Sequence, residues 1–454
     1  MLRVSAKENG ALARRAAAGL ARAGLGTGDR VVIALPAQSA PADEVAEIQA
    51  MILGLAFGAL CSGIVPVMIN SALPQPEQAT LFADAQASMT LNTSAGLARV
   101  FTAGEGARVP ELSETPLSRP MHYTSGTTGQ SKGVWSGVCD EAEARQLWGD
   151  EQGQWQFYPA DVTLVHGPFA HAAPLRFAML VLLAGGSVLL PGGFKATQVA
   201  LSLRDDKPTH AFVVPSHIQR LMALPGGPPP SPYRLLTHAG AACPPTLKRA
   251  IHSWAGTDRT WEFYGSTEGQ FTACHGPDWE QRPGTLGQAR KGRRLIIDDG
   301  VIWCEAPAWA RFEYWNDPEK TRTAWRTTAT GHAFSVGDLG RLDDDGFLWL
   351  EGRRDDLIIS GGINVYPAQV EAILIEHPGV SEVAVFGIED EQWGQRVAAA
   401  VVGEINPAEL TQWASPRLAK YQRPKEIYHV GDLPRTQSGK IRRAELARYL
   451  GLGP

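Results

Sequence analysis

Residues 123 to 134 read Tyr123-Thr-Ser-Gly-Thr-Thr-Gly-Gln-Ser-Lys-Gly-Val134, and this stretch decides more about the fold than any other. It combines glycines, Thr and Ser hydroxyls and one lysine, and it is too polar and flexible to belong to a core. Glycines let a backbone approach a ligand closely, and successive N–H groups can then form a nest for an anion. The stretch therefore predicts a polyphosphate-binding loop, although the same composition is also typical of a flexible linker.

This loop differs from the Walker A loop of P-loop ATPases and kinases. The Walker A pattern has glycine directly before its lysine and Ser or Thr directly after it. Here Ser131 precedes Lys132, and Gly133 follows it. The sequence therefore disfavours a P-loop enzyme.

The composition is that of an ordinary globular protein. The chain has 454 residues, enough for two or three domains, and a formal net charge of −5. This charge gives no general attraction to nucleic acid or to an anionic membrane. No two of the five cysteines stand at metal-ligand spacing, and their number is odd. We therefore expect a reducing, cytoplasmic setting and no nucleic-acid partner.

Two uncharged stretches are close in length to a membrane-spanning helix: residues 51–69 and 177–194. Ser62-Gly63 and Pro66 interrupt the first, and Gly185-Gly186 interrupts the second. A buried helix, a glycine stop and a short strand explain both stretches better than a membrane span.

Short apolar strands alternate with helical stretches over most of the chain, which predicts α/β layers with largely parallel sheets. We expect strands at residues 29–35, 162–166, 211–214, 235–237 and 260–264. We expect helices at residues 11–24, 174–184, 215–224 and 244–254. Residues 294–303 predict a hairpin that turns at Asp299-Gly300.

A second unit begins near Arg353-Arg-Asp-Asp356. Strands are expected before Ser360 and at residues 382–386 and 397–402. Helices are expected after Pro367, near 407–419 and from Arg442. About a hundred residues suffice for a small α+β domain.

The segment Tyr264-Gly-Ser-Thr-Glu-Gly269 follows an expected strand, and ligands gather at strand ends in α/β sheets. Tyr264 offers a flat face for an adenine ring, and Thr267 offers a hydroxyl. Glu268 is a hard oxygen ligand suited to Mg²⁺ that bridges phosphates. Alone, such a hexapeptide is more often a plain turn that exposes an acid.

Three further segments carry chemistry. The small side chains of Ala239-Gly-Ala-Ala-Cys-Pro244 leave space for a planar group, or allow tight helix–sheet packing. Gly337-Asp-Leu-Gly340 presents a carboxylate that can accept two ribose hydroxyls. Pro434-Arg-Thr-Gln-Ser-Gly-Lys-Ile-Arg-Arg443 places a lysine, Lys440, on a loop that contains glycine.

In this order and spacing, the motifs resemble those of the adenylate-forming enzymes, the superfamily of acyl- and aryl-CoA synthetases, adenylation domains and luciferases. The loop at 123–134 departs from the usual Tyr-Thr-Ser-Gly-Thr-Thr-Gly-x-Pro-Lys-Gly only at Ser131, where proline is common. Tyr264 to Glu268 match Tyr-Gly-x-Thr-Glu with no departure. Val336 replaces the threonine of the family's Thr-Gly-Asp.

The resemblance implies roles for particular residues. It implies catalytic roles for Lys440, Glu268, Thr267 and His171, with Glu268 holding Mg²⁺. The ATP-binding residues that it implies are Thr124, Ser125, Gly126, Thr127, Thr128, Gly129, Lys132, Gly240, Ala241, Ala242, Glu262, Tyr264, Gly265, Ser266, Asp338 and Arg353. It further implies that Asp355 is a hinge and that Gly361 and Gly362 line the tunnel for the pantetheine arm of CoA.

The resemblance also implies a fold and its division. Residues 1–354 would form a large N-terminal domain of layered α/β sheets with a β-barrel-like part. Residues 355–454 would form a small mobile α+β domain that carries Lys440.

The implied activity joins a carboxylic acid to CoA with ATP and Mg²⁺, through an acyl-AMP and with release of pyrophosphate. Amino-acid-activating members carry an Asp near Pro168-Phe-Ala-His171, and this chain has none there, so an aliphatic or aromatic acid is expected. Two alternatives stay open: transfer to a carrier protein's phosphopantetheine in trans, and a non-catalytic nucleotide or acyl binder. The sequence does not identify the acid, and it is compatible with a monomer or a homodimer.

Overall fold

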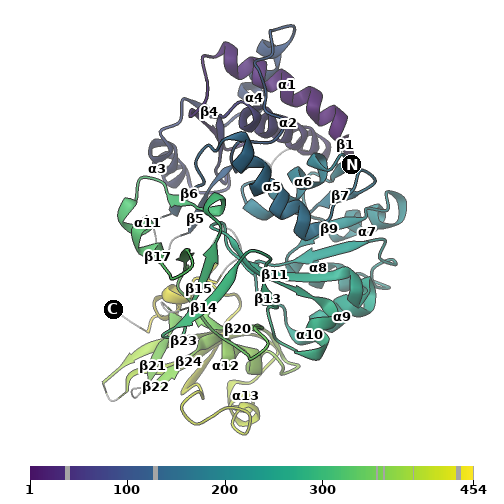
Figure 1. The fold of residues 1–454 in the computed structure, drawn as a ribbon. Helices are drawn as coiled ribbons and strands as arrows, with labels where there is room; N and C mark the ends of the chain where they lie inside the picture. The colour runs from purple at the N-terminus through teal and green to yellow at the C-terminus, as the bar shows by residue number, and fades with distance from the viewer. Residues whose placement is uncertain are drawn as a thin grey trace. The chain divides into compact units, whose positions relative to one another are not determined.

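The computed structural model describes residues 1–35, 41–125, 131–353, 356–360, 363–391, 393–435 and 441–452. The chain divides into two compact units (Figure 1). The first unit comprises Met1–Leu295 and Cys304–Phe334, and the second comprises Ile296–Trp303 and Ser335–Pro454. The boundary predicted between residues 354 and 355 is a different one: it marks where the mobile C-terminal domain would begin, and it stays a prediction.

The first sheet of the first unit contains the strands around the glycine-rich loop, in the order β16-β6-β5-β3-β2-β4. Strands β4, β2, β3 and β5 run parallel, while β6 and β16 are antiparallel to their neighbours. The bounds are β2 (Arg30–Ile33), β3 (Val65–Met68), β4 (Met89–Leu91), β5 (Met121–Ser125), β6 (Ser131–Trp135) and β16 (Glu313–Tyr314).

The second sheet has the order β1-β8-β7-β9-β10-β11-β12-β13. Its five central strands, β8 to β11 with β7, run parallel, and its edge strands are antiparallel. The bounds are β1 (Leu2–Ser5), β7 (Val162–Val165), β8 (Ser187–Leu190), β9 (His210–Val213), β10 (Leu235–His238), β11 (Thr260–Gly265), β12 (Gln270–His275) and β13 (Gln288–Ala289). The predicted strands and the parallel α/β architecture are confirmed.

Helices cover these sheets. They are α1 (Ala6–Arg22), α2 (Ala42–Cys61), α3 (Gln75–Ala85), α4 (Ser94–Gly104), α5 (Glu141–Trp155), α6 (Ala172–Leu183), α7 (Ala196–Asp205), α8 (Pro215–Met222), α9 (Pro245–Ala255), α10 (Gly276–Gln281) and α11 (Pro318–Ala324). Helix α1 begins at a capping box in which Ser5 and Glu8 bond each other's backbone N–H. The expected helices are therefore present, although α1 starts several residues earlier than predicted.

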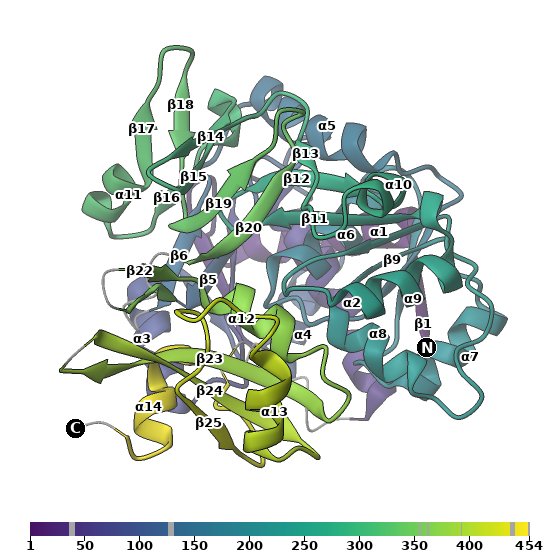
Figure 2. The same ribbon diagram turned by 90° about the horizontal axis from the view of Figure 1, so that it is seen from below.

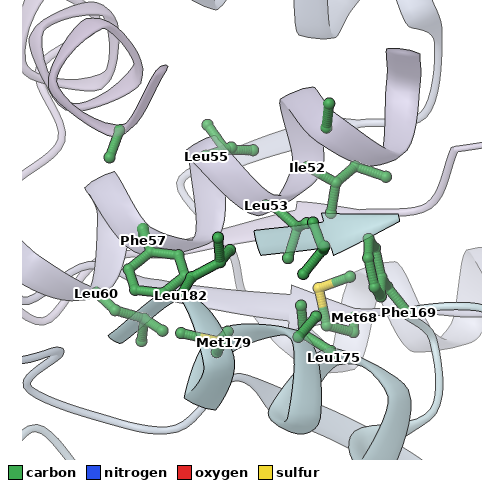
Figure 3. Packing of buried hydrophobic residues seen from close by; sticks show 14 of the residues in the cluster. Ile52, Leu53, Leu55, Phe57, Leu60, Met68, Phe169, Leu175, Met179 and Leu182 are labelled. Carbon is green, nitrogen blue, oxygen red and sulfur yellow. The ribbon is translucent and has the colours of Figure 1, made fainter. Parts of the chain in front are cut away.

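Both uncharged stretches form a helix, a glycine turn and a strand, as predicted: α2 with β3, and α6 with β8. Helix α2 packs against α6, with Leu53, Phe57 and Leu60 near Met179 and Leu182 (Figure 3). Among the described residues, α2 is the one helix long and apolar enough to cross a membrane. Its apolar window is 78% buried within the protein, which is typical of a core helix.

Glycines in α2 set how closely it approaches α1. A Cβ on Gly58 would lie 2.2 Å from the carbonyl oxygen of Ala13, and one on Gly54 would lie 2.4 Å from Cβ of Leu12. Only glycine permits such backbone contact. The alanine-rich sequence of α1 serves the same close packing.

A hairpin of β14 (Arg294–Asp298) and β15 (Val301–Ala306) turns at Asp299 and Gly300, as predicted. Both turn residues have positive φ, 50° and 73°, as a type I′ turn requires. In the first unit, residues 304–306 pair with β18 (His332–Phe334), which pairs with β17 (Trp325–Thr327).

The second unit contains β19 (Asp338–Leu342), which pairs with β20 (Leu348–Arg353), and a further sheet in the order β22-β21-β24-β23 with β25 beside β24. Figure 2 shows β23, β24 and β25 side by side. The bounds are β21 (Ile358–Ser360), β22 (Ile363–Val365), β23 (Val380–Asp390), β24 (Gly394–Gly403), β25 (Glu426–His429), α12 (Pro367–Leu374), α13 (Pro407–Ala414) and α14 (Leu446–Tyr449). Two helices are shorter than predicted. Helix α13 ends just before Ser415-Pro416: Ser415 keeps helical φ and ψ, but Pro416 has no N–H to continue the helical hydrogen bonds. Helix α14 follows a 3₁₀ turn at Arg443–Glu445.

Candidate active site

The predicted phosphate-binding loop connects the two antiparallel strands β5 and β6. Thr124 is opposite Lys132 and Ser125 is opposite Ser131, and Thr124 Oγ1 lies 3.5 Å from the Lys132 carbonyl oxygen. Gly126, Thr127, Thr128 and Gly129 lie outside the described residues, and Ser125 is described by its backbone alone. Strand pairing therefore fixes both ends of the loop.

Tyr314 joins this hairpin to Glu268. Strand β16 pairs with β6, so that Tyr314 is opposite Val134. The Tyr314 hydroxyl donates a 2.8 Å hydrogen bond to Glu268 Oε1, and its ring centroid lies 5.9 Å from Lys132 Nζ. The lysine of one motif and the carboxylate of another thus both lie near a single tyrosine. Sequence reasoning missed Tyr314, because a two-residue strand leaves no periodic signal.

The Tyr264–Glu268 segment forms a tight turn between β11 and β12. Ser266 N–H donates to the Gly269 carbonyl at 2.8 Å, and a Cβ on Gly265 would lie 2.6 Å from that same oxygen. The Tyr264 ring packs against Phe271, with centroids 4.9 Å apart. Thr267 stays partly exposed while Glu268 is buried. The turn presents Thr267 and Glu268 together.

The small-residue loop lies at the same sheet edge. Strand β10 runs parallel to β11, so the carboxyl ends of these neighbours meet. Gly240, at φ 88°, and the exposed Ala241 and Ala242 follow β10 directly. Their predicted place as one wall of a nucleotide site fits this position and stays a prediction.

Glu262 has an internal partner. Its carboxylate accepts a 3.1 Å contact from Lys248 Nζ, and Lys248 also lies 2.5 Å from His238 Nε2. All three side chains are buried. Burial raises the pKa of Glu262 against the opposing effect of Lys248, and burial with Lys248 lowers the pKa of His238. The predicted contact of Glu262 with ATP stays a prediction, and sequence reasoning missed Lys248 as its partner.

His171 is the N-cap residue of α6, where its N–H donates to the Pro168 carbonyl at 3.1 Å. A small cavity begins at this helix. Its volume is about 20 Å³, and its lining includes Arg119, His122, Arg176 and Thr267. Thr267 thus lies on the wall of a polar cavity, while the role predicted for His171 stays untested.

In the second unit, Asp338 is paired with Arg353 where β19 meets β20. Asp338 is 6% exposed, and Gly337 before it has φ 82°. Arg353 is described by its backbone alone. Strand pairing therefore brings together two residues that were assigned to the nucleotide from segments fifteen positions apart.

The described residues on either side of 436–440 are held in place. Arg435 and Ile441 form a β-bridge, and Arg442 N–H donates to the Pro434 carbonyl at 2.8 Å. Arg443 binds Asp356 at 2.5 Å and Glu371 at 2.8 Å. Four other predicted residues lie outside the described residues: Lys440, Asp355, Gly361 and Gly362.

The role predicted for Glu268, holding Mg²⁺, stays a prediction, and the residues around it can be compared with what Mg²⁺ needs. Within the described ranges, no three His, Cys, Asp or Glu side chains gather as a metal site. Mg²⁺ is commonly held by one or two carboxylates together with substrate phosphates and water. One buried carboxylate, hydrogen-bonded to the tyrosine whose ring lies near Lys132, fits that pattern.

Comparison with known proteins agrees with this geometry. The pattern of the family described as "AMP-binding enzyme" matches residues 3–301, and that of the "AMP-binding enzyme C-terminal domain" matches residues 369–440. The chain belongs to the AMP-binding enzyme family.

Curated relatives of this AMP-binding enzyme are CoA ligases. It is 29% identical to the long-chain-fatty-acid–CoA ligase FadD13 of Mycobacterium tuberculosis, over 97% of this chain and 92% of that one. It is 34% identical to the 2-succinylbenzoate–CoA ligase of Geobacillus kaustophilus, over 78% and 75%.

Solved structures show the same fold. The o-succinylbenzoate CoA synthetase MenE of Bacillus subtilis, solved with its acyl-adenylate intermediate, has a TM-score of 0.82 at 26% identity, over 97% of this chain and 92% of that one. ATP-bound MatB of Rhodopseudomonas palustris has a TM-score of 0.81 at 26% identity, over 98% and 93%. The predicted family is confirmed.

Proposed function

We propose that this enzyme is an AMP-forming acid–thiol ligase, which converts a carboxylic acid, ATP and CoA into an acyl-CoA, AMP and pyrophosphate. The observation that carries the proposal is the contact of Tyr314 with Glu268 and its approach to Lys132. A cation and a carboxylate held near one tyrosine suit a metal-bound polyphosphate. The CoA ligase relatives support the same reaction.

In the first half-reaction, the substrate carboxylate attacks the α-phosphorus of ATP. Both reactants are anions, so the dominant barrier is electrostatic. Mg²⁺ held by Glu268 would neutralise phosphate charge. We assign Lys132 and the hydroxyl of Thr267 to the phosphates, and Asp338 to the ribose.

In the second half-reaction, the CoA sulfur attacks the acyl-AMP carbonyl and AMP leaves. We assign Lys440 to the first half-reaction only, and we assign the change between half-reactions to rotation of residues 355–454 about Asp355. Gly361 and Gly362 would then line the pantetheine tunnel. We assign CoA, rather than a carrier protein, as the acyl acceptor. We place the enzyme in the cytoplasm, as a monomer or a homodimer. The proposed reaction involves no nucleic acid and no membrane span.

The test is pyrophosphate release with a panel of carboxylic acids, followed by mass spectrometry of products made with CoA and with carrier proteins. Pyrophosphate and an acyl-CoA are expected. Lys440→Ala should slow adenylation by about 10²–10³, the usual effect of one such donor, and should slow thioester formation from preformed acyl-AMP far less. Lys420→Ala is the matched control, because Lys420 is exposed in the same unit.

Three outcomes would contradict the proposal. Pyrophosphate release that yields only acylated carrier protein would reassign the acceptor. Equal damage to both half-reactions would remove the role of Lys440. ATP binding without pyrophosphate release for any acid would indicate a non-catalytic binder.

A further inference from the structure

A cluster of buried charges lies inside the first unit, and the mechanism above does not use it. It contains four arginines and two acids, called here the arginine cluster: Arg119, Asp150, Glu151, Arg176, Arg290 and Arg293. The two acids lie in the second half of α5, and Arg176 lies on α6. Five of the side chains are at most 11% exposed, and Asp150 is 12% exposed.

The charged groups around Asp150 form normal hydrogen bonds with one another. Arg293 binds Asp150 with both terminal nitrogens, each at 3.0 Å. Arg290 binds the same carboxylate at 3.1 Å and Gln270 Oε1 at 2.8 Å. These are charge-assisted bonds at normal distances, so this group is a structural ion pair.

The arginines around Glu151 form no such hydrogen bonds with its carboxylate. Arg119, Arg176 and Arg290 all approach one oxygen, Glu151 Oε1, and each lies 3.6 Å from it. That distance is too long for a hydrogen bond. Neither the Arg119 nor the Arg176 guanidinium forms a hydrogen bond with another residue in the described part of the chain. Two rigid donor groups therefore lack close acceptors.

The cluster also carries excess charge. Four guanidinium groups face two carboxylates, so its formal charge is +2. Burial alone would raise the pKa of Glu151, but Arg290, Arg176 and Arg119 outweigh burial and lower it to about 2. Burial, followed by Arg176, lowers the pKa of Arg119 to about 9, which leaves it protonated at neutral pH.

Neighbouring groups do not remove this excess. His122, which faces Arg176 and His171, has a pKa that burial lowers to about 4, so it is neutral. Buried charge without a partner is costly, and a purely structural cluster needs no excess. A bound anion would balance the charge.

The under-bonded arginines point to where that anion would lie. Arg119 and Arg176 both line the cavity of about 20 Å³ that Thr267 also lines. One water needs roughly 10–15 Å³ of such space, so the cavity suits a group as small as a carboxylate and not an alkyl chain. Thr267 directly precedes Glu268, so the wall of this cavity carries the two arginines and one residue assigned to the reaction centre.

We propose that Arg119 and Arg176 bind a second carboxylate of the acid substrate, so that this enzyme prefers short dicarboxylic acids over monocarboxylic acids of the same length. The proposal rests on the proposed function, since the substrate of that reaction fills the cavity. The planar guanidinium fork matches a carboxylate in two-point contact, which explains arginine rather than lysine at both positions.

The test compares matched acids: butanoate with butanedioate, and pentanoate with pentanedioate. Pyrophosphate release should give a kcat/KM for each diacid at least about 10²-fold above that of its monoacid, because a site built for a polar group rejects analogues that lack it. Arg176→Gln should reduce that ratio to about 10 or less, mainly by raising KM for the diacid. Arg176→Lys keeps the positive charge but lacks the planar guanidinium fork. Its diacid-to-monoacid ratio should lie between those of the wild type and Arg176→Gln.

Arg204→Gln is the control, because Arg204 is exposed on α7 in the same unit. Arg119→Gln gives a second, independent variant, and urea unfolding of each variant verifies folding. A wild-type preference for monoacids, or a diacid ratio unchanged in folded Arg176→Gln, would overturn the proposal.

Calorimetric titration of the full chain with the same acids separates this proposal from the proposed function. Diacid binding that is lost in Arg176→Gln supports the carboxylate site even if no acid yields pyrophosphate. Pyrophosphate release with monoacids alone, without diacid binding, sinks the carboxylate site and leaves the ligase function standing.

Discussion

Two groups of buried charges in the first unit differ in how they are balanced. Lys248 and Glu262 form a pair, one charge of each sign, with Nζ–Oε2 at 3.1 Å and His238 beside them. The arginine cluster has a formal charge of +2, and Glu151 meets its three arginines at 3.6 Å each. The first group is compact and neutral, and the second is loose and positive.

This difference separates a structural group from a candidate binding group. A buried ion pair persists when each partner compensates the other's lost hydration. The Lys248 pair joins α9 to β11, beside His238 at the end of β10. The arginine cluster keeps two donors uncompensated at a cavity wall, which is useful only if a ligand supplies the missing charge. Substitutions should therefore act differently on the two groups.

The largest effect is expected for Lys248→Met. It leaves the Glu262 carboxylate buried without its cation, which typically costs about 3–5 kcal/mol of unfolding free energy. Urea unfolding measures this loss. The double variant Lys248→Met with Glu262→Leu should recover most of it, and Lys7→Met, at an exposed site on α1, should change little. A small effect of Lys248→Met alone would show that the Lys248–Glu262 pair is not a structural ion pair.

The next effect is the acid sensitivity that Glu151 confers. Its folded pKa of about 2 lies below the ordinary value of 4.5. A lowered folded pKa gives stability that is present above the unfolded pKa and is lost as pH falls toward 2, here about 3 kcal/mol. Urea unfolding between pH 7 and pH 2 measures it. In Glu151→Gln, this loss of unfolding free energy should already be present at pH 7. The unfolding free energies of the variant and the wild type should converge near pH 2. Parallel curves for the two proteins would contradict the assignment.

A smaller effect is expected for Arg176→Gln, whose unfolding free energy should change by at most about 1 kcal/mol. The substitution reduces the excess charge, and Arg119 and Arg290 still face Glu151. Urea unfolding at pH 7 measures the change, with Arg204→Gln as control. A loss as large as that of Lys248→Met would make Arg176 a structural partner and erase the contrast.

The smallest effect is expected for an exposed pair on the same helix as Glu151. Arg145 and Glu141 lie 3.5 Å apart, and both are more than 60% exposed. Replacing Arg145 by Ala should cost about 0.3–0.5 kcal/mol, the usual value of such a helix pair, and less at high salt. Thermal unfolding at two ionic strengths sets this baseline. A loss of several kcal/mol would show that burial is not what separates the pairs on α5.

The sequence predicted the α/β layers, most strands and the order of the motifs, because each of these is encoded by neighbouring residues. Apolar runs bounded by glycine gave the strands, and Asp299-Gly300 gave the hairpin turn. Helix ends were less predictable, as α13 shows: Pro416 ends a helix whose apolar pattern continues beyond it. The predicted roles of Lys440, Asp355 and the phosphate-loop tip stay predictions, since these residues lie outside the described part of the chain.

By itself, then, the sequence determined the family, the positions of the phosphate and metal motifs, and the alternation that builds the sheets. Only the tertiary structure brought Tyr314 to Glu268 and near Lys132. Only the fold gathered Arg119, Arg176 and Arg290 around one oxygen of Glu151. Each of these arginines, taken singly, resembles a solvated surface charge. Motifs are local, and their chemistry can be read along the chain. Charge balance depends on which distant segments share the same low-dielectric interior, and folding alone decides that.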